Sequence, residues 1–342
     1  MINRGRFRAS AYTRFEYSTL TLDIIGSTTV IDMLAPLTLN YQKFRNWSQQ
    51  PSRFKTSDFE KLKASGITVF HTAVGFQTGD VHASSLSDIS AWQTFISWHR
   101  ERFQRIDSVA DLKHVKELGK IGILIGQQNS AHFRTENDVD TFYGLGQRVS
   151  QLTYTGNRLG GGSSDATNLG LSEYGARVVA RMNQVGMAVD VSHCSDRTTL
   201  DAIFASRKPV LVTHSNCRAL VPGSRRCKTD EAIRKMGLHR GVLGVTMIRS
   251  FVRANGPATI ENMLDHVDHV ARITGIEHVG IGTDVDLDGH DPSINADLAG
   301  VECQKKIFDI TEGLVRRKYT AEQIRLILGG NFERALSEIW TS

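Results

Sequence analysis

Residues 170–193, GLSEYGARVVARMNQVGMAVDVSH, hold one complete copy of the pattern that decides the fold. Ser172 is a good helix N-cap, the apolar positions after it recur with helical spacing, and Gly186 stands where a helix commonly ends. The run AVDVS at residues 188–192 is short, apolar and β-branched, and it ends at His193. A helix that leads into a buried strand, with polar residues at the strand's end, is the unit of a parallel α/β sheet.

Apolar runs of the same kind recur along the whole chain. We expect strands at residues 29–34, 68–73, 121–126, 150–154, 188–192, 210–213, 242–247 and 279–282. Helical periodicity separates several of them, at residues 57–65, 172–185 and 262–274. Alternating strands and helices fit a closed barrel or an open doubly wound sheet. The GxGxxG turn typical of the open sheet does not follow the first strand, which favours the barrel.

The sequence therefore predicts a single-domain (β/α)8 TIM-type barrel. We place the barrel at residues 26–342, the N-terminal extension at residues 1–25, and an insertion or a long helix at residues 92–107. A length of 342 residues lies within the range of this fold.

Charge and composition exclude several classes of protein. The net charge of +5 is modest, and the basic residues are scattered except at Arg225, Arg226 and Lys228, so we expect no nucleic-acid partner. No apolar run approaches the roughly 18 residues of a membrane span. The first 20 residues are basic and polar without an apolar core, so they do not resemble a signal peptide and we expect a cytoplasmic protein. The four cysteines have no disulfide-like spacing.

The candidate chemistry lies at the carboxyl ends of the expected strands, where a barrel collects its active residues. His193 ends the fifth strand, His214 the sixth, and Asp284 the eighth. Two neutral imidazoles and a carboxylate suit a divalent metal and its bound water, and Asp284 could also act as the base for that water. The alternative is that each histidine is only a polar residue at a strand end.

Further polar residues follow other expected strands. Gln128 follows the third strand, while Tyr154 ends the fourth and Asn157 comes shortly after it. Arg218, just past the sixth strand, could bind a substrate carboxylate through two parallel hydrogen bonds, or it could form a surface salt bridge. The glycine-rich residues 160–164 lack the lysine of a P-loop and are better explained as a flexible loop over the pocket.

Several of these segments together resemble the membrane (renal) dipeptidase family of the amidohydrolase superfamily. They are residues 170–193 quoted above, 209–220 (PVLVTHSNCRAL), 228–236 (KTDEAIRKM), 278–289 (HVGIGTDVDLDG) and 329–336 (GGNFERAL). The resemblance implies a barrel that cleaves dipeptides with two zinc ions joined by a bridging carboxylate. It also implies a homodimer.

The resemblance assigns roles to four residues. His193 and His214 match the two histidines of one zinc site, and Asp284 matches an aspartate that contacts metal and helps proton transfer. Arg218 resembles the arginine that holds the substrate's carboxylate.

Other positions depart from the family pattern. The family's first strand carries approximately DGHxD, but here Leu34 and Pro36 stand at the two ligand positions. Gln128 stands at the bridging glutamate and Tyr154 at an expected histidine. We therefore expect either one divalent metal ion per chain, zinc or another, held by His193, His214 and weakly by Gln128, or none. Asp32, the first residue of the motif, could donate to metal but more plausibly supports the ligands.

Three functions remain open from the sequence. The first is a dipeptidase-like hydrolase of amide or peptide-like bonds in small, carboxylate-bearing, amino-acid-like or dipeptide-like substrates. It would use Asp284 and Tyr154 in catalysis and Arg218 and Asn157 in substrate binding. The second is a metal-independent lyase or isomerase on the same barrel. The third is a ligand-binding relative without catalysis.

Overall fold

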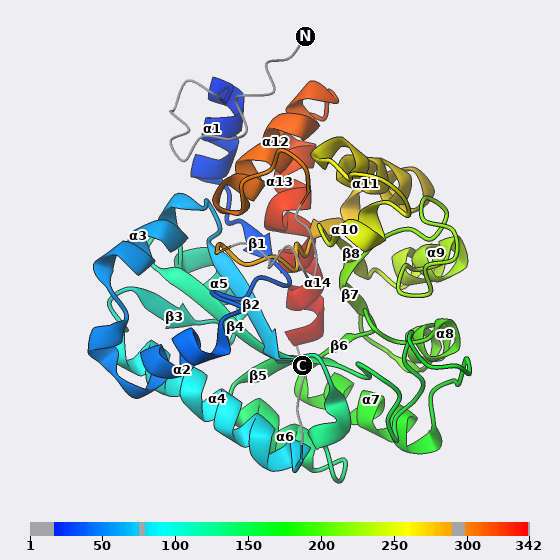
Figure 1. The fold of residues 1–342 in the computed structure, drawn as a ribbon. Coiled ribbons are helices and arrows are strands. Elements are labelled where there is room, and N and C mark those ends of the chain that lie inside the picture. Colours follow the sequence, from blue (N-terminus) through cyan, green and yellow to red (C-terminus); the bar gives the residue numbers. More distant parts are fainter. Residues whose placement is uncertain (1–16, 75–78, 289–297, 341–342) are drawn as a thin grey trace.

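The computed structural model describes residues 17–74, 79–288 and 298–340 and shows one sheet of nine parallel strands (Figure 1). The strands are β1 Ile31–Asp32, β2 Val69–Val74, β3 Phe103–Arg105, β4 Ile121–Gln127, β5 Gln147–Gln151, β6 Ala188–Asp190, β7 Leu211–Ser215, β8 Val242–Val245 and β9 Val279–Ile281.

Eight of these strands close into a barrel. β1 pairs with β2 on one side and with β9 on the other, and β2 continues the ring by pairing with β4. β3 pairs only with the first half of β4, and β5 takes over the same edge at Ile125. The predicted (β/α)8 barrel is confirmed.

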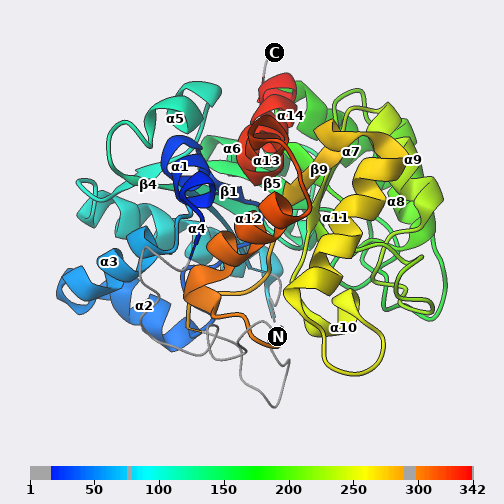
Figure 2. The same ribbon diagram turned by 90° about the horizontal axis from the view of Figure 1, so that it is seen from above.

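Helices surround this barrel, as the two ribbon views show (Figures 1 and 2). The α-helices are α1 Thr19–Ser27, α2 Tyr41–Gln49, α3 Thr56–Ala64, α4 Val81–Trp98, α5 Val109–His114, α6 Asp138–Gly144, α7 Glu173–Val185, α8 Asp196–Ala205, α9 Asp230–Leu238, α10 Arg249–Val252, α11 Ile260–Thr274, α12 Lys306–Arg316, α13 Ala321–Arg325 and α14 Asn331–Trp340.

The repeat at residues 170–193 folds as its residues predict. The Ser172 hydroxyl accepts from the Gly175 N–H at the start of α7, and Gly186 ends the helix with φ of 85°. A residue with a Cβ is disfavoured in that left-handed conformation, so glycine is strongly preferred at this C-cap. β6 follows directly and is buried over its whole length.

Two expected segments differ from the structure. β5 begins at Gln147, so the expected strand at residues 150–154 was placed too far along the chain. Residues 92–107 are not one long helix, because α4 ends at Trp98 and β3, which lies outside the closed ring of eight strands, follows it. Phe103 of β3 packs at ring-centroid distances of 5.0 Å from Phe95 and 5.5 Å from Phe54, and this aromatic packing favours the strand.

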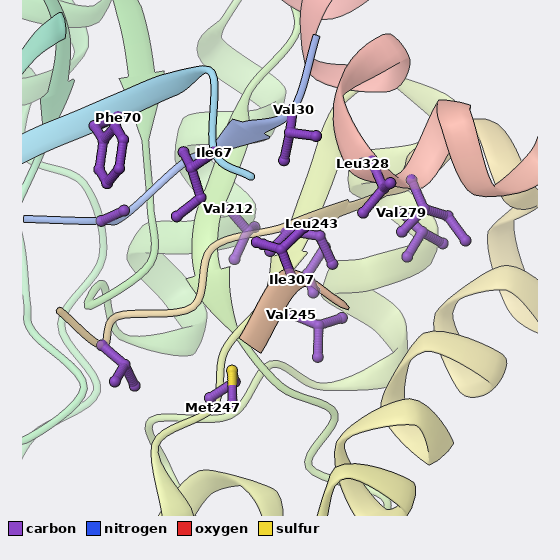
Figure 3. Close-up of a cluster of buried hydrophobic side chains, with 14 of the residues drawn as sticks. Val30, Ile67, Phe70, Val212, Leu243, Val245, Met247, Val279, Ile307 and Leu328 are labelled. Carbon is purple, nitrogen blue, oxygen red and sulfur yellow. The ribbon is translucent and has the colours of Figure 1, made fainter. Parts of the chain in front are cut away.

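Apolar side chains fill both the space between barrel and helices and the barrel's amino end. Figure 3 shows Val212, Leu243 and Val245 of the sheet lying with Ile307 of α12 in the outer layer. At the amino end, Phe332 of α14 packs with the first residues of several strands. In Figure 2, α14 lies on the opposite side from α10, which follows the carboxyl end of β8. The carboxyl face of the barrel is therefore the one left for a site.

Helix α1 spans the boundary expected at residue 25 and packs against α12. The Tyr17 hydroxyl donates to Asp309 at 3.0 Å, and the Thr21 hydroxyl donates to Glu312 at 2.7 Å. Within the described ranges, we find no helix with the length and hydrophobicity needed to span a lipid bilayer.

Candidate active site

His193 and His214 meet at the carboxyl face of the barrel. His193 follows β6, His214 lies within β7, and these strands are neighbours in the sheet. Their Nε2 atoms are 3.0 Å apart, so both rings direct the same nitrogen toward a common point. His214 is fully buried, whereas His193 is partly exposed. The pairing predicted from the two strand ends is thus present in the structure.

Hydrogen bonds behind the pair determine which nitrogen of His214 carries its proton. The Ser192 hydroxyl donates to Asp190 Oδ1 at 2.6 Å and the Thr213 hydroxyl donates to Asp190 Oδ2 at 2.7 Å. Because each hydroxyl has a single proton, Thr213 Oγ1 can only accept at its 2.8 Å contact with His214 Nδ1. Nδ1 therefore carries the proton of neutral His214, and Nε2 presents a lone pair to His193.

Both histidines are held neutral. Burial, followed by the positive charge of Arg226, lowers the pKa of His193 and of His214 well below the usual range. A neutral imidazole can accept a proton or a hydrogen bond, or ligate a metal, at physiological pH.

Arg226 is a component of the site that sequence reasoning did not assign. Its Nη1 donates to the Ser192 carbonyl at 2.7 Å and its Nη2 to the His214 carbonyl at 2.8 Å, so it bridges the two histidine-bearing strands. Its Nε has no hydrogen-bond partner within the described ranges. The available signal in the sequence is the local concentration of basic residues at 225–228.

Arg218, by contrast, is already engaged. Its two terminal nitrogens donate to the Asp196 carboxylate at 2.6 and 2.7 Å, and its Nε donates to the carbonyls of Ser224 and Cys227. This is the salt-bridge alternative that the sequence left open. Arg218 would have to leave Asp196 to bind a substrate carboxylate with the same two nitrogens.

Tyr154 and Asp284 complete the surroundings of the histidine pair. The Tyr154 ring stacks on His193 with centroids 4.1 Å apart and planes 22° apart. Burial, together with the negative charge of Asp284, raises the pKa of Tyr154 to about 12, so its phenol stays protonated and can donate. Burial, then the negative charges of Asp88 and Asp284, raise the pKa of Tyr41 at the start of α2. Burial lowers the pKa of Arg226, and the charge of Asp284 partly offsets that lowering. The negative charge of Asp284 therefore acts on Tyr154, Tyr41 and Arg226 alike.

The two remaining predicted site residues take part in loop structure. Asn157 donates to Asn129 Oδ1 and to the Leu152 carbonyl, both at 2.9 Å, and accepts from the Leu159 N–H. The Gln128 carbonyl accepts from Gln151 Nε2 at 2.5 Å. Within the part of the chain that the structure describes, the Gln128 side chain forms no hydrogen bond with either histidine.

The donor set does not fit a two-zinc centre. Leu34 is buried at the end of β1 and has no donor atom, and Pro36 follows it. Across residues 17–74, 79–288 and 298–340, no three His, Cys, Asp or Glu side chains come together as a metal site would need. His193 and His214 offer two nitrogens to a single ion, whereas catalytic zinc usually has three protein ligands.

The comparisons with known proteins agree with this fold and its strand-end residues. The family model described as membrane dipeptidase (peptidase family M19) matches residues 21–341. The chain belongs to the membrane dipeptidase family. The resemblance inferred from the sequence is confirmed.

Two proteins named as dipeptidases and one solved structure are similar to this family member. Dipeptidase tcpJ of Claviceps purpurea is 29% identical over 268 residues, which cover 76% of this chain and 61% of that protein. An uncharacterized dipeptidase of Schizosaccharomyces pombe is 30% identical, with 73% and 61% covered. The chain thus spans less than two thirds of these curated relatives. A crystal structure of an amidohydrolase from Pseudomonas aeruginosa is 27% identical with a TM-score of 0.81, covering 94% of this chain and 99% of that one.

Proposed function

We propose that this protein hydrolyses the amide or peptide-like bond of a small, carboxylate-bearing substrate of the amino-acid or dipeptide type. The observation that carries the proposal is the neutral histidine pair, with Nε2 atoms 3.0 Å apart, beside Tyr154 and Arg226, two groups on which the negative charge of Asp284 acts. Membership of a dipeptidase family and similarity to proteins named dipeptidases support it.

The side chains present can carry out the proton transfers of such a reaction. Asp284 takes one proton from a water molecule whose oxygen attacks the carbonyl carbon. The carbon–nitrogen bond then breaks, and the same proton passes to the leaving amine. Tyr154 donates to the carbonyl oxygen as negative charge develops on it. His214 Nε2 exchanges its contact with His193 Nε2 for the second hydrogen of the water and so orients it.

The fixed positive charge of Arg226 favours the binding of an anionic substrate at the carboxyl face of the barrel. Its guanidinium is held by two backbone carbonyls, so it needs no rearrangement to attract a carboxylate or a developing oxyanion. Arg218 and Asn157 remain proposed substrate-binding residues, and both would act from the loops around the pocket.

A metal, if present, is expected at no more than one ion per chain. His193 and His214 would hold it, with Gln128 as a weak third ligand, and the ion would polarise the scissile carbonyl or lower the pKa of a water molecule. Elemental analysis of protein purified without added zinc or chelator measures this directly. Two equivalents would contradict the loss of ligands at Leu34, Pro36 and Gln128. One equivalent that is lost in the His193→Ala and His214→Ala variants would support the reduced site.

The reaction type is tested with a panel of dipeptides and N-acyl amino acids in water enriched in oxygen-18. Hydrolysis places one heavy oxygen in the product carboxylate, whereas a lyase or an isomerase does not. Absence of turnover on a substrate-like ligand that binds would favour the non-catalytic alternative.

The role of Asp284 is tested by Asp284→Asn on the best substrate of that panel. Loss of a general base costs about 10²–10⁴-fold in kcat, with ligand affinity nearly unchanged. Asp288→Asn is the matched control, because Asp288 lies four residues further on and is held by Lys43 and Lys61. Equal activity in both variants would remove Asp284 from the mechanism. The cytoplasmic location and the homodimer predicted from the sequence remain predictions.

A further inference from the structure

Asp284 has a backbone conformation that needs support. Its φ is 60°, in the left-handed region that residues other than glycine rarely adopt. A Cβ disfavours this conformation, although aspartate adopts it more readily than most other residues. The Asp284 N–H donates to the Leu34 carbonyl at 2.8 Å, which ties it to the end of β1. That one backbone hydrogen bond does not hold the residues before and after Asp284 in place.

A fully buried charged pair supplies that support. Lys306, the first residue of α12, and Asp32 of β1 are both 0% exposed, and Lys306 Nζ lies 3.5 Å from Asp32 Oδ2. Asp32 accepts from the Thr283 N–H at 2.8 Å and from the Thr283 hydroxyl at 2.6 Å. Lys306 Nζ donates to the same hydroxyl at 2.6 Å and also to the Val285 carbonyl. The pair therefore holds the residue before Asp284 and the residue after it.

This arrangement is costly if its only role is stability. Burying two charges incurs a large desolvation penalty, and well-packed apolar residues often replace such pairs without loss of stability. The contacts of this pair reach Thr283 and Val285, which are the two neighbours of Asp284. Lys228 gives a parallel case, because its buried Nζ donates to the carbonyls of Val191 and Cys194 on either side of His193.

We propose that the Lys306–Asp32 pair is a positioning device that fixes the carboxylate of Asp284 at the mouth of the barrel. The role rests on the proposed function of Asp284 as the base. The pair links α12, β1 and the end of β9, so it sets the direction in which Asp284 leaves the sheet. Lys306 and Asp32 act through the backbone of residues 283–285 and touch no substrate themselves.

Three variants test the proposal in the full chain. Lys306→Met keeps a long apolar stem and removes the donor, and Asp32→Asn/Lys306→Met removes both charges so that no uncompensated ion is buried. Thr283→Val keeps the shape and the net charge but removes the bridging hydroxyl. Lys116→Met is the matched control, because Lys116 also donates to two backbone carbonyls, those of Ile25 and Thr28, next to α1.

The expected result is a loss of kcat with little change in KM. A misplacement of about 1 Å costs on the order of 10²-fold in rate, so we expect that loss for the two Lys306 variants and about tenfold for Thr283→Val, with KM within about threefold. Lys116→Met should lower thermal stability without this split between kcat and KM. If the Lys306 variants do not fold, the kcat and KM of Thr283→Val alone test the positioning role. Full kcat in folded Thr283→Val, or in the folded double variant, would overturn the proposal.

Hydrogen exchange gives a second test that needs no turnover. The Asp284 amide is protected by its bond to the Leu34 carbonyl. We expect peptide 281–288 to exchange faster in Thr283→Val and in the double variant, and at the wild-type rate in Lys116→Met. Unchanged exchange in the first two would refute the positioning role even if Asp284→Asn is inactive. Faster exchange together with an active Asp284→Asn would instead refute the proposed base and leave the support of this segment established.

Discussion

Replacement of Asp309 by asparagine is expected to stabilise the protein above pH 7. Asp309 lies on α12 beneath α1, is 2% exposed, and has no partner for its Oδ2 in the described structure. Burial raises the pKa of Asp309 to about 7 from 3.8, although the hydrogen bond from the Tyr17 hydroxyl acts in the opposite direction. The folded protein therefore binds this proton more tightly than the unfolded chain does.

The sign and the size of the effect follow from linkage between protonation and folding. Below pH 4 the carboxyl is neutral in both states and carries no penalty. As the pH rises from about 4 to about 7, the unfolded chain releases the proton first, so the folded state loses stability. A difference of about three pKa units, at about 1.4 kcal/mol each, gives an upper value of about 4 kcal/mol. Asparagine does not ionise and avoids this loss.

Urea denaturation followed by circular dichroism at pH 5, 7 and 8.5 measures the effect. The gain in Asp309→Asn should grow with pH and level off above pH 7. Glu312→Gln is the control, because Glu312 accepts from the Ser18 N–H, the Ser18 hydroxyl and the Thr21 hydroxyl and should be destabilised by losing its charge. A gain that does not change with pH, or a loss of stability at pH 8.5, would refute the assigned ionisation.

Two further predictions concern the barrel interior and the stacked tyrosine. Gly126→Ala should destabilise the fold by about 1–3 kcal/mol, because a Cβ there would lie 2.0 Å from His71 Nε2. Gly144→Ala, where nothing lies within 4 Å, is its control, and equal melting temperatures would contradict the predicted clash. Tyr154→Phe should keep the ring on His193 and the melting temperature, yet lower kcat by about 10²-fold through loss of the hydroxyl donor. Unchanged kcat would remove Tyr154 from catalysis.

The barrel could be predicted because its strands are buried on both faces. A segment such as β4, in which every residue is buried, leaves a continuous apolar run in the sequence, and helices with clear caps separate such runs. β3 could not be predicted in this way. It has three residues, only Phe103 of them is fully buried, and its stability comes from aromatic neighbours far away in the sequence.

The histidine pair could be predicted because parallel strands end at the same edge of a sheet. His193 follows one strand and His214 lies near the carboxyl end of its neighbour, so their rings can converge at one edge of the sheet. The directions of the arginine side chains are not constrained by the sheet in this way. Arg218 and Arg226 lie on the same loop, eight residues apart in sequence, and only the path of that loop directs one to Asp196 and the other to the histidines.

The sequence by itself therefore determined the family, the barrel and the strand ends that carry His193, His214 and Asp284, because these follow from local periodicity and motif spacing. The tertiary structure decided which nitrogen of His214 carries its proton and which arginine contacts the histidine-bearing strands. It also decided that Lys306 contacts the residues on either side of Asp284. Those features depend on contacts such as Asp32 with Thr283, which are separated by 251 residues. Long-range contacts of this kind leave no period in the sequence, since nothing local requires their partners to be spaced in any regular way.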